Sequence, residues 1–159
     1  MRNNHLTILL SVLMCMVGIA SSAHDFELNG IYYKITSATD RAVAVTYKGD
    51  GPFSNTDRYK GNVSIPPTVL YNGKTYNVTS ISNEAFEMCD GLTTLVIPNS
   101  VTSIGQFACY RCTGLVTVNI PADVTTIEQG AFYGCSSLAS ITIPKKVVSL
   151  GGSAFSGCI

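Results

Sequence analysis

VTSISNEAFEMCDGLTTLVIPNS, residues 78–100, decides the fold, because the chain repeats this stretch at a constant spacing. VTSIGQFACYRCTGLVTVNIPAD (101–123) and VTTIEQGAFYGCSSLASITIPKK (124–146) follow it directly, and VVSLGGSAFSGCI (147–159) begins a fourth copy. Each copy starts 23 residues after the one before, without a gap. Self-similarity at a fixed period of this length is typical of a solenoid, in which successive coils stack on one another.

Each of the three complete copies contains a strand pattern, L-x-x-[LVI]-x-I-P. Leu95 and Ile97 would point into the core and Thr94 and Val96 to the other side, because strand side chains alternate. Pro98 ends the strand, since it has no amide proton for a ladder. Stacked copies therefore predict one parallel sheet whose inward side chains line a continuous core.

The A-F-x-x-C segment must return the chain on the side away from this sheet. It is too short for a full helix and predicts one helical or 3₁₀ turn. The second copy differs from the others, because Cys109 occupies the phenylalanine slot and Phe107 lies two places earlier. We therefore expect a local rearrangement of that coil.

The whole pattern, I-x-x-x-A-F-x-x-C-x-x-L-x-x-I-x-I-P, resembles the BspA-like leucine-rich repeat family of bacterial surface proteins. The match covers about half of the chain strongly. The resemblance implies a secreted or surface-attached, non-enzymatic protein that binds host or extracellular-matrix partners. The expected fold class is a β-rich α/β solenoid of 23-residue leucine-rich repeats. It has a parallel β-sheet on one face, short helical turns on the other, and an N-terminal β-hairpin cap.

The amino-acid composition argues against nucleic acid as a partner. Of the 159 residues, 46% are hydrophobic and only 13% are charged, with 10 basic and 10 acidic side chains. The chain is too apolar for disorder, and the balanced charge predicts no basic patch for nucleic acid. The expected partner is instead a protein or surface ligand of unknown identity.

Residues 1–23 have the pattern of a secretory signal peptide. Arg2 supplies the positive start, Leu6–Ala20 the apolar segment, and Ser21 and Ala23 the small residues before cleavage. The apolar run is shorter than the roughly 20 residues that span a bilayer. We therefore predict a mature chain that begins near His24, has no membrane span, and is secreted or placed on the bacterial cell surface.

Residues 24–61 lack the repeat and carry strand patterns. Phe26–Leu28 and Ile31–Ile35 flank Asn29-Gly30, which is a strong hairpin signal, and Ala42–Tyr47 is a further strand pattern. The favoured interpretation is a cap over the first coil, because a bare solenoid end exposes core. The alternative is a separate binding module. The solenoid would then comprise residues 62–159, with a second hairpin at Asn72-Gly73 and an incomplete last repeat.

Five cysteines remain once Cys15 leaves with the signal peptide. Cys89, Cys112, Cys135 and Cys158 recur at the period of the repeat, which favours buried free thiols, since cysteine is often buried. Cys109 and Cys112 form a C-x-x-C motif, so a thiol redox protein is an alternative.

The sequence predicts no enzyme, metal or cofactor. Its histidines are His5, in the predicted signal peptide, and His24, at the start of the mature chain, so no Ser-His-Asp or Cys-His site is expected. Neither a second C-x-x-C motif nor a nearby histidine completes a zinc set with Cys109 and Cys112.

The candidate binding face consists of the outward side chains of the predicted sheet. These small, uncharged residues form two columns: Thr94, Val96, Thr117, Asn119, Ser140 and Thr142. Solenoids bind partners over such extended surfaces, although threonine and serine are also ordinary residues of a solvated strand. Because the fourth copy stops before its own strand, we expect Val147, Leu150 and Phe155 to leave one side exposed. The remaining alternative to an adhesion protein is a non-functional fragment of a longer repeat protein.

Overall fold

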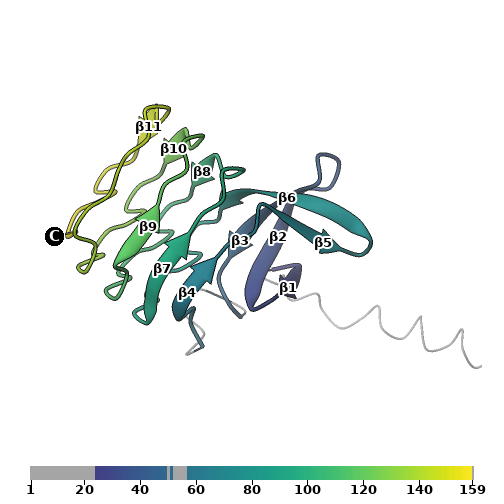
Figure 1. Ribbon diagram of the computed structural model, residues 1–159, viewed down its shortest axis with the longest axis horizontal. Helices are drawn as coiled ribbons and strands as arrows, with labels where there is room; N and C mark the ends of the chain where they lie inside the picture. Colours follow the sequence, from purple (N-terminus) through teal and green to yellow (C-terminus); the bar gives the residue numbers. More distant parts are fainter. Residues whose placement is uncertain (1–23, 50, 52–56, 159) are drawn as a thin grey trace, which may run out of the picture.

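The computed structural model describes residues 24–49, 51 and 57–158, which form a row of stacked coils with a group of longer strands at one end (Figure 1). The predicted signal peptide lies outside the described residues. In chain order the strands are β1 (Phe26–Leu28), β2 (Ile31–Ser37), β3 (Ala42–Thr46), β4 (Gly61–Ser64), β5 (Thr68–Tyr71), β6 (Lys74–Ile81), β7 (Leu92–Val96), β8 (Ser103–Ile104), β9 (Thr117–Asn119), β10 (Thr126–Ile127) and β11 (Ser149–Leu150).

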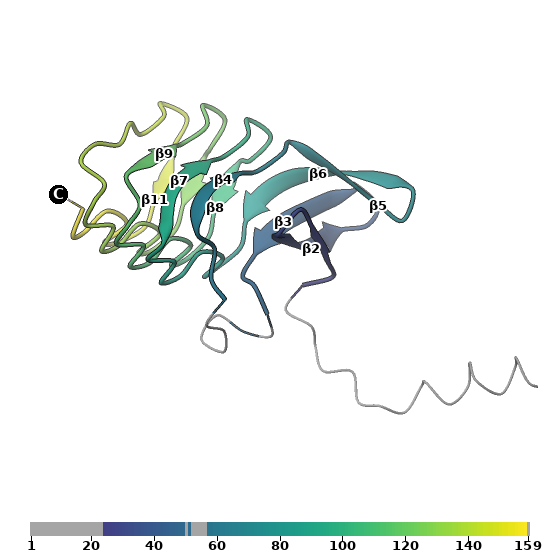
Figure 2. The ribbon, with the colours of Figure 1, turned by 60° about the horizontal axis from the view of Figure 1, so that its bottom comes forward.

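Two sheets run along the row of coils (Figure 2). Sheet A has the order β1-β2-β3-β6-β8-β10-β11, with β5 paired to β6, and sheet B has the order β4-β7-β9. The pairs between successive repeats are parallel, as in Thr94 with Thr117 and Ile104 with Ile127. Each of these partners is 23 residues from the other, so the period of the sequence is also the register of the sheets.

Sheet B is the predicted parallel sheet, formed by the L-x-x-[LVI]-x-I segments. The third copy is an exception, because the equivalent segment Ser140–Thr142 is not a strand. Among the described residues no backbone hydrogen bond joins this segment to β9. An edge segment has ladder bonds on one side at most, so it gains less from the strand conformation than β7, which pairs on both sides.

The expectation of a single sheet is wrong. The V-T-x-I segment of each copy forms sheet A, where Ser80 pairs with Ser103 and Thr126 with Ser149. Valine, threonine and isoleucine favour strands because their branched side chains pack well on a pleated surface. Two paired residues in each coil are too few to produce a visible alternation, so the pattern of apolar residues did not reveal them.

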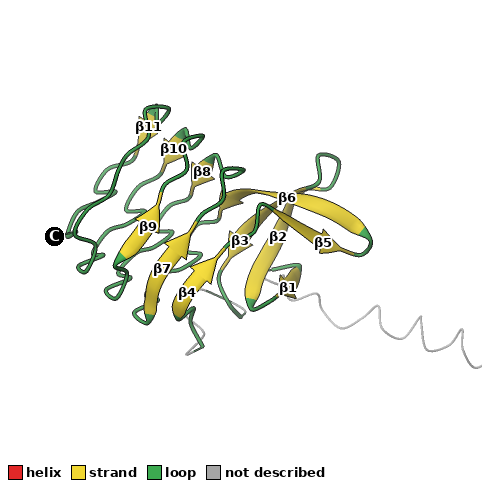
Figure 3. Ribbon diagram, viewed as in Figure 1, coloured by secondary structure: helices red, strands yellow, loops and turns green. Residues whose placement is uncertain are grey.

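The expected helical turns are also absent from the described residues, which contain no helix (Figure 3). Alternate amides of the A-F-x-x-C segment close tight turns, such as Glu87 N to Glu84 O at 3.1 Å. The amides between them bond to the following coil, such as Phe86 N to Ala108 O at 2.7 Å. The backbone φ is positive at Glu84 (59°) and Met88 (52°), and positive φ interrupts a right-handed helix.

The second coil is not rearranged, contrary to expectation. Cys109 N bonds to Ala131 O at 2.7 Å, just as Phe86 N bonds in the coil before. Cys109 is buried in the phenylalanine slot, and Phe107 lies half-buried on the outside of the turn. The backbone bonds between coils fix the path of the chain, so exchanging the two side chains changes the surface rather than the coil.

Both predicted hairpins are confirmed. β1 pairs antiparallel with β2, and β5 pairs antiparallel with β6. The turn residues have positive φ throughout: 53° and 78° at Asn29 and Gly30, and 48° and 70° at Asn72 and Gly73. Asparagine and glycine tolerate this conformation best, which explains their place at both tips.

The core continues from the N-terminal strands into the repeats. Tyr33, Val43 and Val45 are fully buried, and the Tyr59 ring lies 4.8 Å from that of Phe86 between ring centroids. β3 pairs in parallel with β6, so residues 24–61 extend sheet A beyond the first coil. The role of this region as a protective cap remains a prediction.

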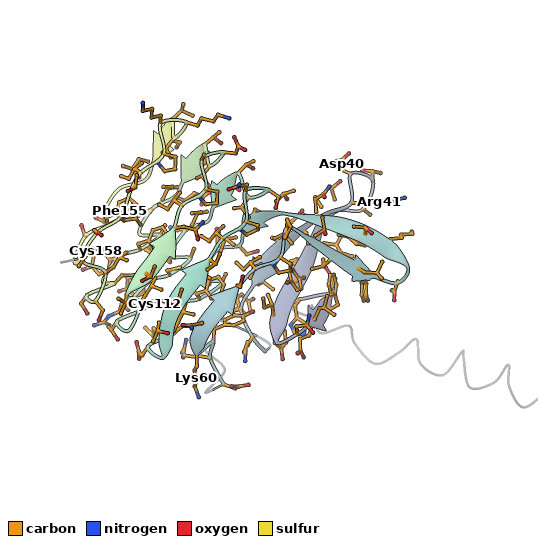
Figure 4. All side chains as sticks on the ribbon, viewed as in Figure 1. Asp40, Arg41, Lys60, Cys112, Phe155 and Cys158 are labelled. Carbon is orange, nitrogen blue, oxygen red and sulfur yellow. The ribbon has the colours of Figure 1, made fainter. Side chains whose placement is uncertain are left out.

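The far end of the row is exposed in part: of the three residues predicted to leave one side uncovered, Leu150 is 52% exposed, and Val147 and Phe155 are half-buried. Phe155 and Cys158 lie in the coil farthest from the N-terminal strands (Figure 4). Val148 is 86% exposed, whereas Ile127, which pairs with Leu150, is fully buried. The last coil thus covers the third coil and is itself partly uncovered among the described residues.

Candidate functional site

The predicted binding face lies on sheet B and the segment beside it. Thr94 and Val96 come from β7, and Thr117 and Asn119 come from β9, one coil further. Their cross-strand pairing places Thr94 beside Thr117 and Val96 beside Asn119. Val96 is 44% exposed, Thr117 and Asn119 are exposed, and Thr94 is half-buried. The four residues thus make one continuous, uncharged surface.

Ser140 and Thr142 are also exposed, but they do not extend the sheet. A groove of about 350 Å³ lies between β9 and the segment 140–142. Thr117, Asn119, Ser140 and Thr142 all line it. The predicted columns therefore form a flat patch on β7 and β9 that continues into a shallow groove at the unpaired edge of β9.

The Asn119 side chain is hydrogen-bonded to the backbone of the neighbouring coil. Its Oδ1 accepts a hydrogen bond from Ile97 N at 3.0 Å, and its Nδ2 donates one to Ile97 O at 2.9 Å. The amide side chain thereby continues the ladder past the end of β7. Since both polar groups already have partners, Asn119 contributes shape to the face and little free hydrogen-bonding capacity.

The cysteines are free, as predicted, and four of the five are buried. Cys112 Sγ donates to Phe86 O at 2.9 Å, and Cys135 Sγ donates to Cys109 O at 3.1 Å. The thiols thus act as weak donors that join neighbouring coils.

The pKa values of the C-x-x-C pair oppose redox chemistry. The pKa of Cys112 is well above its usual value, because the Cys109, Cys135 and Cys89 thiols share hydrogen bonds with it and because it is buried. The hydrogen bond with Cys112 lowers the pKa of Cys109, but burial and the nearby Cys135 and Cys89 outweigh it, so the net pKa is raised. A reactive cysteine needs the opposite shift and access to solvent.

A second concave surface lies on the turns that return each coil, and the sequence did not predict it. We call it the aromatic groove, defined by Glu84, Glu87, Met88, Phe107, Tyr110 and Tyr133, with a volume of about 530 Å³. The signal that could have revealed it is Phe107, an aromatic residue displaced from the core slot to the outward slot of its turn. Tyr110 and Tyr133 then repeat at the period of 23.

Glu87 is the least solvated carboxylate of this groove. It is only 7% exposed, and its Oε2 atom has no hydrogen-bond partner among the described residues. Burial and then the neighbouring Glu84 carboxylate raise the pKa of Glu87, and Arg58 opposes them in part. Arg58 Nη1 also donates a hydrogen bond to Glu87 O at 2.5 Å.

No group of three or more His, Cys, Asp or Glu side chains within residues 24–49, 51 and 57–158 is arranged to hold a metal ion. Within those same ranges, no helix has the length and apolar character needed to cross a membrane.

Comparison with known proteins gives a family and several structures. One family profile, described as the BspA type leucine rich repeat region (6 copies), matches residues 63–159. No curated protein matches the chain. A leucine-rich repeat protein from Bacteroides ovatus is 35% identical with a TM-score of 0.73, and the alignment covers 85% of this chain and 33% of that one.

Two further solved structures are similar. A leucine-rich repeat protein from Bacteroides capillosus is 30% identical with a TM-score of 0.62, covering 77% of this chain and 83% of that one. A leucine rich cell surface protein from Faecalibacterium prausnitzii is 26% identical with a TM-score of 0.62, covering 84% of this chain and 40% of that one. The chain therefore spans less than half the length of the Bacteroides ovatus and Faecalibacterium proteins.

Proposed function

The chain belongs to the BspA-type leucine-rich repeat family, and from this premise we propose that it is a secreted or cell-surface, non-enzymatic protein that adheres to a host or extracellular-matrix protein. Leucine-rich repeat proteins of this family work through protein–protein contact. The Faecalibacterium protein is a cell surface protein, and this similarity and the predicted signal peptide together support an external location for this chain.

The observation that carries this function is the exposed face of sheet B. Thr94, Val96 and Thr117 present small, uncharged side chains on a surface held by parallel ladder bonds. The groove beside β9 adds a concave edge of about 350 Å³. A rigid, preformed surface loses little conformational entropy when a partner binds, so it suits recognition of a folded protein.

The test places a large charge in the middle of this face. Thr117→Arg should weaken binding of the protein to its target within a panel of purified extracellular-matrix proteins, measured by surface plasmon resonance. Thr125→Arg is the matched control, because Thr125 is also an exposed threonine but precedes β10 in sheet A.

Binding that is lost in Thr117→Arg and kept in Thr125→Arg supports the sheet B face. If the wild-type protein binds no member of the panel, adhesion to matrix is wrong. If both variants bind like the wild type, the partner uses another surface. Circular dichroism of both variants checks that neither change unfolds the protein.

A further inference from the structure

The aromatic groove owes its shape to the exchange of two side chains in the second coil. With Cys109 in the core slot, the Phe107 ring lies over the turn of the third coil. A Cβ atom on Gly130 would lie 2.4 Å from Phe107 Cε1, so the ring rests directly against that glycine. The absence of a side chain at position 130 therefore lets an aromatic ring lie flat along the surface.

The other rings of the groove continue this arrangement. The Tyr110 and Tyr133 rings are stacked, with centroids 5.3 Å apart and planes at 18°, and Phe107 meets Tyr110 edge-on at 5.4 Å. Tyr133 is 39% exposed. The faces of aromatic rings carry negative potential, which attracts cationic groups. Arg111 shows this attraction on the same turns, since its guanidinium carbon lies 6.0 Å from the Tyr110 centroid.

The charged side chains that line the groove are acidic, and Arg58 and Arg111 lie beside it. Glu84 and Glu87 line it, and its lining residues include no lysine, arginine or histidine. Glu87 is more than nine-tenths buried and its Oε2 atom has no hydrogen-bond partner among the described residues, while the nearby Arg58 offsets part of its negative charge. A buried carboxylate without a full set of partners costs stability unless a cation or donor reaches it.

We propose that the aromatic groove binds an arginine or lysine side chain from a basic segment of a protein partner. The cation would lie over the exposed Tyr133 ring and the half-buried Phe107 ring, with its charge directed to Glu84 and Glu87. The Met88 side chain, which is soft and polarisable, would pack against the aliphatic part of the bound side chain. This site lies on the turns rather than on the exposed face of sheet B, so it does not depend on the proposed adhesion surface.

Met88 provides a direct probe of the groove. The chain has four methionines, and Met88 is the one within the described residues. With ¹³C-labelled methionine methyl groups, the Met88 signal is identified by its loss in Met88→Leu. In the predicted mature chain from His24, Met88 is the one methionine, and titration with an acetylated, amidated hexa-arginine peptide should shift its signal saturably. Hexa-serine and hexa-glutamate peptides should leave the Met88 signal unchanged.

Variants of the groove distinguish the attraction of the cation to the carboxylates from its attraction to the aromatic rings. Glu84→Gln combined with Glu87→Gln keeps the shape of both side chains and should weaken hexa-arginine binding by about tenfold or more, since a charged acceptor holds a cationic donor more strongly than a neutral one does. Tyr133→Ala removes one ring face and should weaken it by about two- to fivefold. Glu128→Gln is the matched control, because it removes one exposed carboxylate from outside the groove and should change affinity little.

Each outcome is decisive. A shift specific to hexa-arginine and reduced by the double glutamine change, but not by Glu128→Gln, supports the site. Equal weakening in Glu128→Gln would mean diffuse electrostatic attraction and would overturn it. A Met88 shift with a neutral oligosaccharide such as maltohexaose, and none with hexa-arginine, would reassign the groove to glycans. The absence of any shift would also overturn it, and a circular dichroism melt confirms that the variants are folded.

Discussion

Two backbone positions in every return turn adopt the left-handed conformation, and the four copies fill them differently. Glu84, Phe107, Gly130 and Ser153 occupy the first position, and Met88, Arg111, Gly134 and Gly157 occupy the second. Non-glycine residues in this conformation cost roughly 1–2 kcal/mol each. Of the three complete copies, only the third has glycine at both positions, so the strain is concentrated in the first two coils.

Gly134→Ala should therefore lower the free energy of unfolding by about 1 kcal/mol or more. Its φ is 71°, and the new Cβ would lie 3.3 Å from Arg111 Cγ. Gly152→Ala is the control, since a Cβ there meets nothing within 4 Å. Urea denaturation followed by circular dichroism measures both, and equal stability of the two variants would contradict the strain assigned to this turn.

Glu87 gives stability a pH dependence. A carboxyl whose pKa is raised on folding binds more protons in the folded state than in the unfolded chain, so the free energy of unfolding falls as pH rises from 4.5 through the raised pKa. Glu87→Gln imitates the protonated form. It should be more stable than the wild type at neutral pH, and the difference should vanish below pH 4.5. Thermal melts of the wild type and Glu87→Gln between about pH 4 and neutral pH measure this difference. If Glu87→Gln is less stable than the wild type at neutral pH, the folded protein stabilises the Glu87 carboxylate, and the prediction is wrong.

At the scale of single elements, sheet B depends on a side chain where its backbone ladder stops. Asn119 on β9 pairs with both the N–H and the C=O of Ile97, just past the end of β7. An asparagine amide can imitate a peptide group in this way because it carries a donor and an acceptor on the same plane. The third copy has Thr142 at this position, which has no amide, and its segment is not a strand.

Asn119→Ala should destabilise the protein by about 1–3 kcal/mol, because it leaves two partly buried backbone groups of Ile97 without partners. Thr117→Ala in the same strand should cost about 0.5 kcal/mol or less, since its side chain is exposed. Chemical denaturation compares them. A similar small loss in both variants would mean that water replaces the amide without cost.

Much of this architecture could be predicted from the period of the repeat. The register of 23, the sheet of L-x-x-[LVI]-x-I segments in the first two copies, and both Asn-Gly hairpins follow from patterns several residues long. The extension of sheet A through the repeats could not be predicted, because β8, β10 and β11 are only two residues long. The turn ladder could not be predicted because its residues include positions of positive φ. The aromatic groove could not be predicted either. The repeat pattern identifies Phe107 as an exception to the buried phenylalanine position, but it does not indicate that the ring lines a groove on the surface.

At the scale of the whole molecule, the two ends differ. Antiparallel strands continue sheet A at the N-terminal end and bury Tyr33 and Val45, whereas the last coil leaves Val148 and Leu150 in solvent. An uncovered parallel edge attracts further strands. The structure therefore favours residues 24–61 as the protecting element, which remains a prediction until it is removed.

A chain that begins at Asn62, and so lacks residues 24–61, tests this role. Without β3, the β6 strand loses its parallel partner along Asn77–Ile81 and exposes the core behind it. We expect this shortened chain to self-associate in light scattering at concentrations where the full chain has a constant mass. A monodisperse shortened chain with a cooperative melt would show that residues 24–61 are a separate module.

The bonds between coils also determine how the protein responds to tension. Ladder and turn bonds such as Phe86 N to Ala108 O link each coil mainly to the next. If the chain were pulled from its two ends, the load would fall on one junction at a time, and coils would peel away in sequence rather than together. Each release would add the extended length of 23 residues, about 75–80 Å. A protein anchored at a cell surface would thereby yield in equal steps, absorbing work while the remaining coils stay folded.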